Sequence, residues 1–182
     1  MEIVSDQQLN RAREGDMAAF ASIIRAHERT VFSIAVRMLL DRAAAEDLAQ
    51  EVFLQLHRSL GDIQSCAHLN AWLRRVTANR AIDVLRAKHT TADLSIDSAL
   101  DVANEETAVD PLLRKHLTSL LAQLSSQARA VLLLRYQEDL DPLEIAQTLD
   151  MPVNTVKSHL KRSLAMLRER IDGPAMPMKV AE

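Results

Sequence analysis

The chain has 182 residues, enough for one or two small domains, and its hydrophobic fraction of 48% is enough to form cores. Glycine (3), proline (5) and aromatic residues (3%) are scarce, which favours helix throughout. The net charge of −3 argues against a uniformly basic nucleic-acid coat, and the single cysteine excludes a disulfide framework. No apolar stretch approaches the length of a membrane span, so we expect an all-α, soluble, cytoplasmic protein with no membrane insertion.

Charge is distributed in blocks along the chain. Residues 71–88 hold five basic residues and one acid, and residues 153–170 have the same balance. Residues 41–62 hold five acids and two bases, and residues 91–110 hold six acids and no base. This pattern predicts two DNA-facing helices, together with acidic surfaces that suit basic partners.

Capping residues mark the first three predicted helices. Ser5 and Gln8 form a capping box, and Asp16 and Asp41 are placed as N-caps of the second and third helices. The second helix carries an apolar stripe that includes His27. We expect His27 to be a hydrogen-bonded residue at the edge of the core, because no second ligand lies at metal spacing.

Polar and acidic residues gather on one face of the third helix. Asp47, Gln50 and Glu51 point away from its apolar stripe. Such a face is either a solvated surface or a docking surface for an arginine-rich partner. These residues by themselves favour the solvated surface.

Residues 61–70 are predicted to form a loop that contains ligand-type side chains. Cys66 and His68, with His57 before them, invite a metal interpretation. Their spacing matches no standard zinc site and a fourth ligand is missing, so we expect no metal and no cofactor.

The helix predicted at residues 69–88 is the first basic element. Arg75, Asn79 and Arg86 fall on one stripe of it, flanked by Trp72 and Asp83. Indole, guanidinium and amide groups on one face suit stacking on unpaired bases and hydrogen bonding to them. Equally, Trp72 could belong to the core and the arginines could be solvated. Three apolar residues are expected to face inward: Leu73, Val76 and Val84.

The helical period fades between residues 89 and 110, which we interpret as a flexible acidic linker and a domain boundary. Helices are predicted to begin at Pro111 and at Ser125 or Ser126. The tail at residues 173–182 is expected to be disordered.

A helix-turn-helix is predicted at residues 141–170. Asp141 and Glu144 cap its first helix, and Asp150 lies at a turn where proline ends that helix two residues later. The second helix begins near Val153. Its polar face suits DNA bases and phosphates, the alternative being a solvated basic surface. The face comprises Asn154, Thr155, Lys157, Ser158, Lys161 and Arg162.

No phosphate-binding loop, nucleophile elbow, zinc-protease motif or pair of inward carboxylates occurs in the sequence, so no enzymatic activity is expected.

Three blocks of sequence together resemble the extracytoplasmic-function (ECF) sigma factors of the sigma-70 family. The first is EDLAQEVFLQLHRSL at residues 46–60, and the second is AWLRRVTANRAIDVLR at residues 71–86. The third, at residues 124–171, begins LSSQARAVLLLRYQ and includes the helix-turn-helix. Their order and separation are more specific than any block alone. The resemblance covers nearly all of residues 6–171.

The resemblance implies a division of the chain and a function. Residues 1–88 would be sigma domain 2, residues 89–110 an acidic linker, residues 111–172 sigma domain 4 and residues 173–182 a tail. The function would be to bind core RNA polymerase, recognise the −35 and −10 promoter elements and promote open-complex formation at the promoters of a specialised regulon. An anti-sigma factor, often membrane-anchored in this family, would control it.

Site roles are implied in the same way. The first block would contact polymerase through Asp47, Gln50 and Glu51, which lifts the docking interpretation above the solvated one. The second would bind the single-stranded −10 element through Trp72, Arg75, Asn79 and Arg86, with a flipped base held by the loop at residues 61–69. The third would bind the duplex −35 element through Asn154, Thr155, Lys157, Ser158, Lys161 and Arg162.

The chain departs from the family pattern at three positions. Arg80 stands where the family usually has an apolar residue, Ala78 where it usually has a basic one, and Asp150 where glycine is common.

Two other functions fit parts of the chain. The sequence TVKSHL also resembles the recognition helix of LuxR-type regulators, and a sigma mimic could sequester an anti-sigma factor. The first and second blocks argue against a stand-alone regulator, and the two intact basic helices argue against a mimic.

Overall fold

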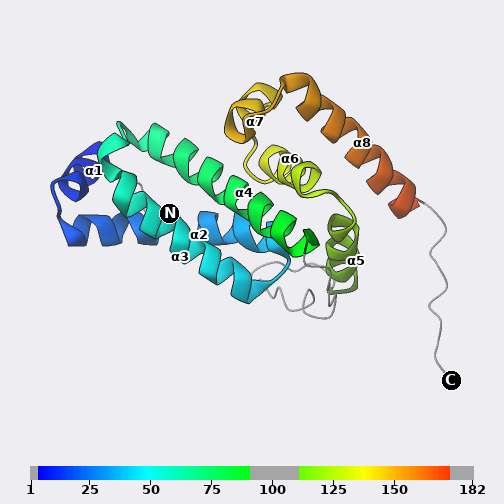
Figure 1. Cartoon of the computed structure of the whole chain (residues 1–182), viewed down its shortest axis with the longest axis horizontal. Helices are drawn as coiled ribbons and strands as arrows, with labels where there is room; N and C mark the ends of the chain where they lie inside the picture. Colours follow the sequence, from blue (N-terminus) through cyan, green and yellow to red (C-terminus); the bar gives the residue numbers. More distant parts are fainter. Residues whose placement is uncertain (1–3, 91–110, 173–182) are drawn as a thin grey trace.

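The computed structural model describes residues 4–90 and 111–172, which form helices and no strand, as predicted (Figure 1). Residues 91–110 of the predicted linker and the predicted tail at residues 173–182 lie outside the described residues. In chain order the elements are α1 (Asp6–Arg13), α2 (Met17–Leu39), α3 (Arg42–Ser59), the short 3₁₀ helix η1 (Leu60–Asp62), α4 (Cys66–Thr90), α5 (Pro111–Ala122), α6 (Ser126–Tyr136), α7 (Pro142–Leu149) and α8 (Val153–Asp172).

The predicted caps of the first three helices are confirmed. Ser5 Oγ accepts a hydrogen bond from the Gln8 amide at 3.2 Å, and Gln8 Oε1 accepts one from the Ser5 amide at 2.9 Å. Asp16 and Asp41 accept hydrogen bonds from amides of the first turns of α2 and α3. These amide donors lower the pKa of both carboxyl groups, because they stabilise the charged form.

The predicted loop at residues 61–70 is wrong in its second half. Ser65 Oγ accepts a hydrogen bond from the His68 amide at 3.1 Å, and the Ser65 carbonyl accepts one from the Leu69 amide at 2.9 Å. Ser65 therefore acts as an N-cap, and α4 begins at Cys66, inside the predicted loop. The helix continues to Thr90, two residues past its predicted end.

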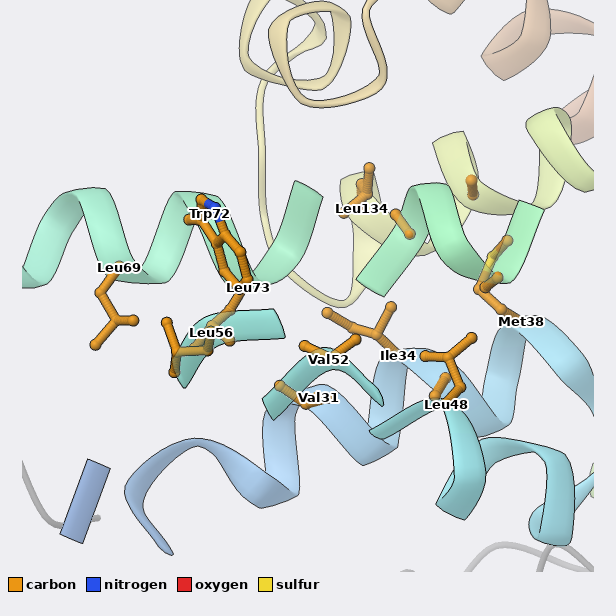
Figure 2. Close-up of a cluster of buried hydrophobic side chains, with 14 of the residues drawn as sticks. Val31, Ile34, Met38, Leu48, Val52, Leu56, Leu69, Trp72, Leu73 and Leu134 are labelled. Carbon is orange, nitrogen blue, oxygen red and sulfur yellow. The ribbon is translucent and has the colours of Figure 1, made fainter. Parts of the chain in front are cut away.

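The N-terminal unit consists of α1 to α4. Its core is built from side chains of α2, α3 and α4 that point toward one another, among them Ile34, Val52 and Leu69 (Figure 2). Of the residues predicted to face inward on α4, Leu73 is buried, whereas Val76 and Val84 are only half-buried. The buried side of α4 is wider than predicted because the helix packs against other helices on two sides.

The C-terminal unit consists of α5 to α8, with Val131, Ile145 and Val156 fully buried in it. It does not stand apart from the N-terminal unit. α6 packs on α2 and α4, and α7 packs on α4 (Figure 1). Buried side chains of both units, Leu134 of α6 among them, form one continuous hydrophobic cluster.

His27 differs from its prediction in one respect. It is half-buried on α2, as expected, but its Nε2 has no hydrogen-bond partner among the described residues. Burial lowers the pKa of His27, and the positive charge of Arg74 lowers it further.

Within residues 4–90 and 111–172, no helix combines the length and hydrophobicity that crossing a bilayer requires.

Candidate nucleic-acid interface

The helix-turn-helix forms as predicted. Asp141 Oδ1 accepts hydrogen bonds from the Leu143 and Glu144 amides at 2.7 and 2.9 Å, and Glu144 Oε2 accepts one from the Asp141 amide at 2.7 Å. Asp150 ends α7 in the left-handed conformation, with φ 49° and ψ 54°. Aspartate tolerates this conformation better than most residues, which explains how it can stand where glycine is common.

The outward face of α8 is open to solvent. All six predicted DNA-contacting residues are exposed, and within the described residues Lys157, Lys161 and Arg162 form no ion pair. The Ser158 hydroxyl donates a hydrogen bond to the Asn154 carbonyl at 2.8 Å, which leaves its oxygen lone pairs as acceptors. The helix therefore presents cations and short polar groups with its apolar side held in the core.

The acidic face of α3 lies beside an apolar hollow that the sequence analysis did not identify. Asp47, Gln50 and Glu51 are exposed, and Leu54 on the same helix is 60% exposed. The hollow has a volume of about 540 Å³. It is lined by Met17, Phe20, Ile24, Gln50, Phe53, Leu54 and His57. In the sequence, the outward position of Leu54 on α3 was the signal for this hollow. Met17 belongs to its lining because α2 packs against α3.

The predicted stripe on α4 is split between solvent and the C-terminal unit. Arg75 and Arg86 are exposed, and Arg86 Nη1 lies 3.9 Å from Asp83 Oδ1. Trp72 is only 7% exposed and belongs to the hydrophobic cluster. Asn79 is half-buried, and its Nδ2 donates to the Thr148 carbonyl of α7 at 3.4 Å. In this conformation the stripe is therefore only partly accessible.

Cys66 fastens the start of α4 to the N-terminal segment. Its Sγ donates to the Val4 carbonyl at 3.2 Å, and its amide donates to Asp6 Oδ1 at 2.9 Å. Burial, together with the hydrogen bond and the charge of Asp6, raises the pKa of the thiol to about 11. Because the thiolate is the reactive and metal-binding form, Cys66 is a structural thiol at neutral pH.

A buried arginine joins three helices and was not predicted. Arg129 of α6 is 5% exposed. Its Nε donates to the Leu121 carbonyl at the end of α5 at 3.0 Å, and its Nη1 donates to the Met38 carbonyl at the end of α2. Burial lowers the pKa of Arg129 to about 10, so the side chain remains charged at neutral pH.

The fold and these surfaces define a two-unit helical protein with a C-terminal helix-turn-helix. Residues 23–91 match the family model "Sigma-70 region 2", and residues 114–167 match "Sigma-70, region 4". The first match spans most of α2 to α4, and the second spans most of α5 to α8.

Relatives match over nearly the full chain. The RNA polymerase sigma-H factor of Pseudomonas aeruginosa is 31% identical over 190 residues, covering 95% of each chain. The ECF RNA polymerase sigma factor SigW of Bacillus subtilis is 27% identical over 184 residues, covering 94% of this chain and 98% of SigW. The chain therefore belongs to the sigma-70 family of RNA polymerase sigma factors, within its ECF group.

Two solved structures share the fold. CnrH, solved in complex with the cytosolic domain of CnrY, has a TM-score of 0.70 at 20% identity, with coverage of 95% of this chain and 100% of CnrH. The sigma factor RpoE of Bartonella quintana, solved with the anti-sigma factor NepR, has a TM-score of 0.70 at 17% identity, with coverage of 86% of this chain and 98% of RpoE.

Proposed function

We propose that this ECF sigma factor directs core RNA polymerase to a specialised set of promoters, using one helix for each contact. α3 binds polymerase, α4 binds the single-stranded −10 element, and α8 binds the duplex −35 element. The observation that carries the proposal is the open basic face of α8, the second helix of a helix-turn-helix whose first helix is capped. The chain acts in the cytoplasm and supplies binding rather than catalytic chemistry of its own.

The α8 face has the donors that duplex recognition needs. Lys161 and Arg162 can donate to base edges or phosphates, and Asn154 at the N-terminal end of α8 can bond to an adenine edge. Recognition helices contact bases mainly through their N-terminal residues. We therefore assign base contacts to the first turns of α8 and phosphate contacts to the cations that follow.

The α3 surface combines charge with a hydrophobic anchor. Carboxylates at Asp47 and Glu51 attract a basic partner, and the hollow beside Leu54 can receive an apolar side chain. Interfaces obtain most of their affinity from such buried anchors, and charges at the rim mainly add association rate and specificity. This combination supports α3 as the polymerase-docking surface.

The −10 contact would couple recognition to strand separation. Arg75 is exposed for phosphate or base contact, while Trp72 and Asn79 supply a stacking surface and an amide. Capturing unpaired bases offsets the cost of unstacking them, which is a few kcal/mol per base. Domain 2 at residues 1–88 and domain 4 at residues 111–172 would thus bind separate parts of one promoter.

An anti-sigma protein is the proposed regulator. CnrH and RpoE, which share the fold, were each solved with a partner, and NepR is named as an anti-sigma factor. If a stoichiometric inhibitor controls this chain as well, a reporter for its promoter should stay silent until expression of the chain exceeds a threshold. A response proportional to expression from the lowest level would contradict this regulation.

The function is tested by reconstituted transcription. Bacterial core RNA polymerase and the purified chain are incubated with a pool of DNA whose −35 and −10 regions are randomised, and the templates that yield transcripts are sequenced. We expect a shared pair of elements to be recovered only when both proteins are present. Tight, sequence-specific duplex binding by the chain without polymerase would instead favour a stand-alone regulator.

The docking surface is tested separately. Asp47→Lys/Glu51→Lys should abolish binding to core polymerase without changing the helical circular-dichroism spectrum, because the reversed charges repel a basic partner. Glu14→Lys/Glu169→Lys makes the same charge change at exposed sites outside α3 and should bind normally. Equal affinity of both double variants would contradict the assignment of α3.

A further inference from the structure

One side of α4 faces the C-terminal unit instead of solvent. α4 lies between the other N-terminal helices and the pair α6 and α7 (Figure 1). Leu134 of α6, which is 1% exposed, lies beside α4 within the shared cluster (Figure 2), and α6 also packs on α2. Because removing a leucine side chain from water is favourable, the apolar part of this contact helps to hold the units together.

An ion pair reinforces the contact. Arg74 Nε of α4 lies 2.9 Å from Glu138 Oε2 in the loop between α6 and α7, and the Glu138 side chain is only 9% exposed. Gln137, beside it, donates to Ser33 Oγ at 3.0 Å and accepts a hydrogen bond from Arg37. A pair shielded from solvent in this way is screened less by salt than a surface pair.

Side chains of one unit also satisfy helix-end carbonyls of the other. Asn79 donates to the Thr148 carbonyl in the last turn of α7, and Arg129 donates to the Met38 carbonyl in the last turn of α2. The last four carbonyls of a helix have no hydrogen-bond partner within that helix. Each of these two bonds therefore gives such a carbonyl a donor that water would otherwise have to provide.

These contacts cover the α4 surface to which we assign the −10 element. Trp72 is 7% exposed, and the Asn79 amide is engaged by α7. A cavity of about 250 Å³ remains between the helices, with Trp72 and Arg75 on the α4 side and Glu144 on the α7 side. A DNA strand that approached Arg75 would therefore meet the Glu144 carboxylate, which repels phosphate.

We propose that the described conformation is autoinhibited: α7 and the α6–α7 loop occupy the α4 surface that binds single-stranded promoter DNA. The inference rests on the proposed function of α4. The faces of α3 and α8 stay exposed, so the closed chain retains access to polymerase and to duplex DNA while the −10 surface is withheld. The apparent affinity for the −10 strand is then reduced by the fraction of chains that are closed.

Trp72 is the single tryptophan of the chain and lies beside the contact, so it reports opening directly. Glu138→Gln removes the charge that holds Arg74. In the full chain it should shift Trp72 emission to longer wavelength, increase quenching by acrylamide, and increase the radius of gyration measured by small-angle X-ray scattering.

Two variants control this experiment. Asp139→Asn makes the same charge change one residue further, where the side chain is 99% exposed, and asparagine tolerates the left-handed conformation at this position. It should behave as wild type. Arg74→Glu/Glu138→Arg exchanges the charges and should restore the closed form. Circular dichroism checks that each variant is folded, and the charge exchange decides the matter if Glu138→Gln is poorly folded.

The functional measurement uses a fluorescent single-stranded oligonucleotide that carries the −10 element recovered by the transcription selection. Glu138→Gln should bind it about three- to tenfold more tightly than wild type, with no change for the −35 duplex. Unchanged Trp72 quenching and unchanged affinity for the −10 strand in folded Glu138→Gln would overturn the autoinhibition alone. Failure to recover any promoter would overturn the proposed function, and the inference with it.

Discussion

The α4 and α8 segments have the same balance of charged residues in sequence, but their predicted DNA-contacting residues differ in accessibility in the structure. Residues 71–88 and residues 153–170 each contain five basic residues and one acid. All six predicted contact residues of α8 are exposed, whereas on α4 Trp72 is buried in the hydrophobic cluster and Asn79 is half-buried and bonded to α7. Composition and periodicity thus identify surfaces that can bind DNA, but packing decides which of them is available.

The difference between α4 and α8 requires that the two units pack on each other. Leu134→Ala tests this packing and should have the largest effect on stability. Leu134 is 1% exposed in the shared cluster, so removing its side chain should lower the free energy of unfolding by about 3 kcal/mol. Urea denaturation followed by circular dichroism and by Trp72 fluorescence should give one coincident transition. Leu117→Ala, at a 39% exposed position on α5, should change stability by less than about 1 kcal/mol. Separate transitions for the two probes would show that the units unfold independently.

The open face of α8 is tested by Lys161→Ala. This variant should weaken binding to the −35 duplex by about 1–3 kcal/mol if Lys161 contacts a base, or reduce the salt slope by about one if it contacts a phosphate. Arg162→Ala is expected to follow the same rule. Fluorescence anisotropy at several salt concentrations distinguishes the two cases. Glu138→Gln should leave this binding unchanged, and unaltered duplex binding in both alanine variants would remove the contact assignment.

The element that covers α4 depends on its N-cap. Asp141→Ala removes the acceptor for two amides at the start of α7 and should lower stability by about 1 kcal/mol. Ser126→Ala on α6 leaves the actual cap, Ser125, in place and serves as the control. Thermal denaturation measures both. Equal melting temperatures for the two variants would mean that the capping box contributes nothing to holding α7 against α4.

The smallest expected effect concerns pH. Because the pKa of His27 is lowered in the folded chain, the unfolded chain binds this proton more strongly, and stability should fall as pH drops below the ordinary value of 6.5. Protonated His27 would also repel Arg74, which holds Glu138. His27→Gln should flatten the dependence of the unfolding free energy on pH between 7 and about 5. His116→Gln, at an exposed position, should retain the wild-type slope, and equal slopes in both variants would contradict this assignment.

Local chemistry made most helix starts predictable. Ser5, Asp16, Asp41 and Asp141 each cap a helix through contacts within three residues, so their neighbours in sequence identify them. The missed start of α4 follows the same rule. Ser65 caps α4 through the His68 amide three residues later, so the signal was present in the local sequence.

The contact between the units could not be predicted, because its residues look ordinary in sequence. Glu138 lies in an acidic stretch that favours solvent, and Arg129 sits among apolar residues with no charged partner near it. Their partners lie far away in sequence: Arg129 bonds to the end of α2, and Glu138 pairs with Arg74 within α4. The sequence is compatible with two roles for Trp72, and tertiary packing shows that it belongs to the core in this conformation.

The thiol that fastens α4 to the N-terminal segment has a practical consequence. With a pKa of about 11, Cys66 is almost entirely protonated near neutral pH and should react slowly with maleimides. A cysteine introduced at an exposed position, with an ordinary pKa of about 8.5, would react much faster. Dyes could therefore be attached at chosen sites on the natural chain without first replacing its own cysteine.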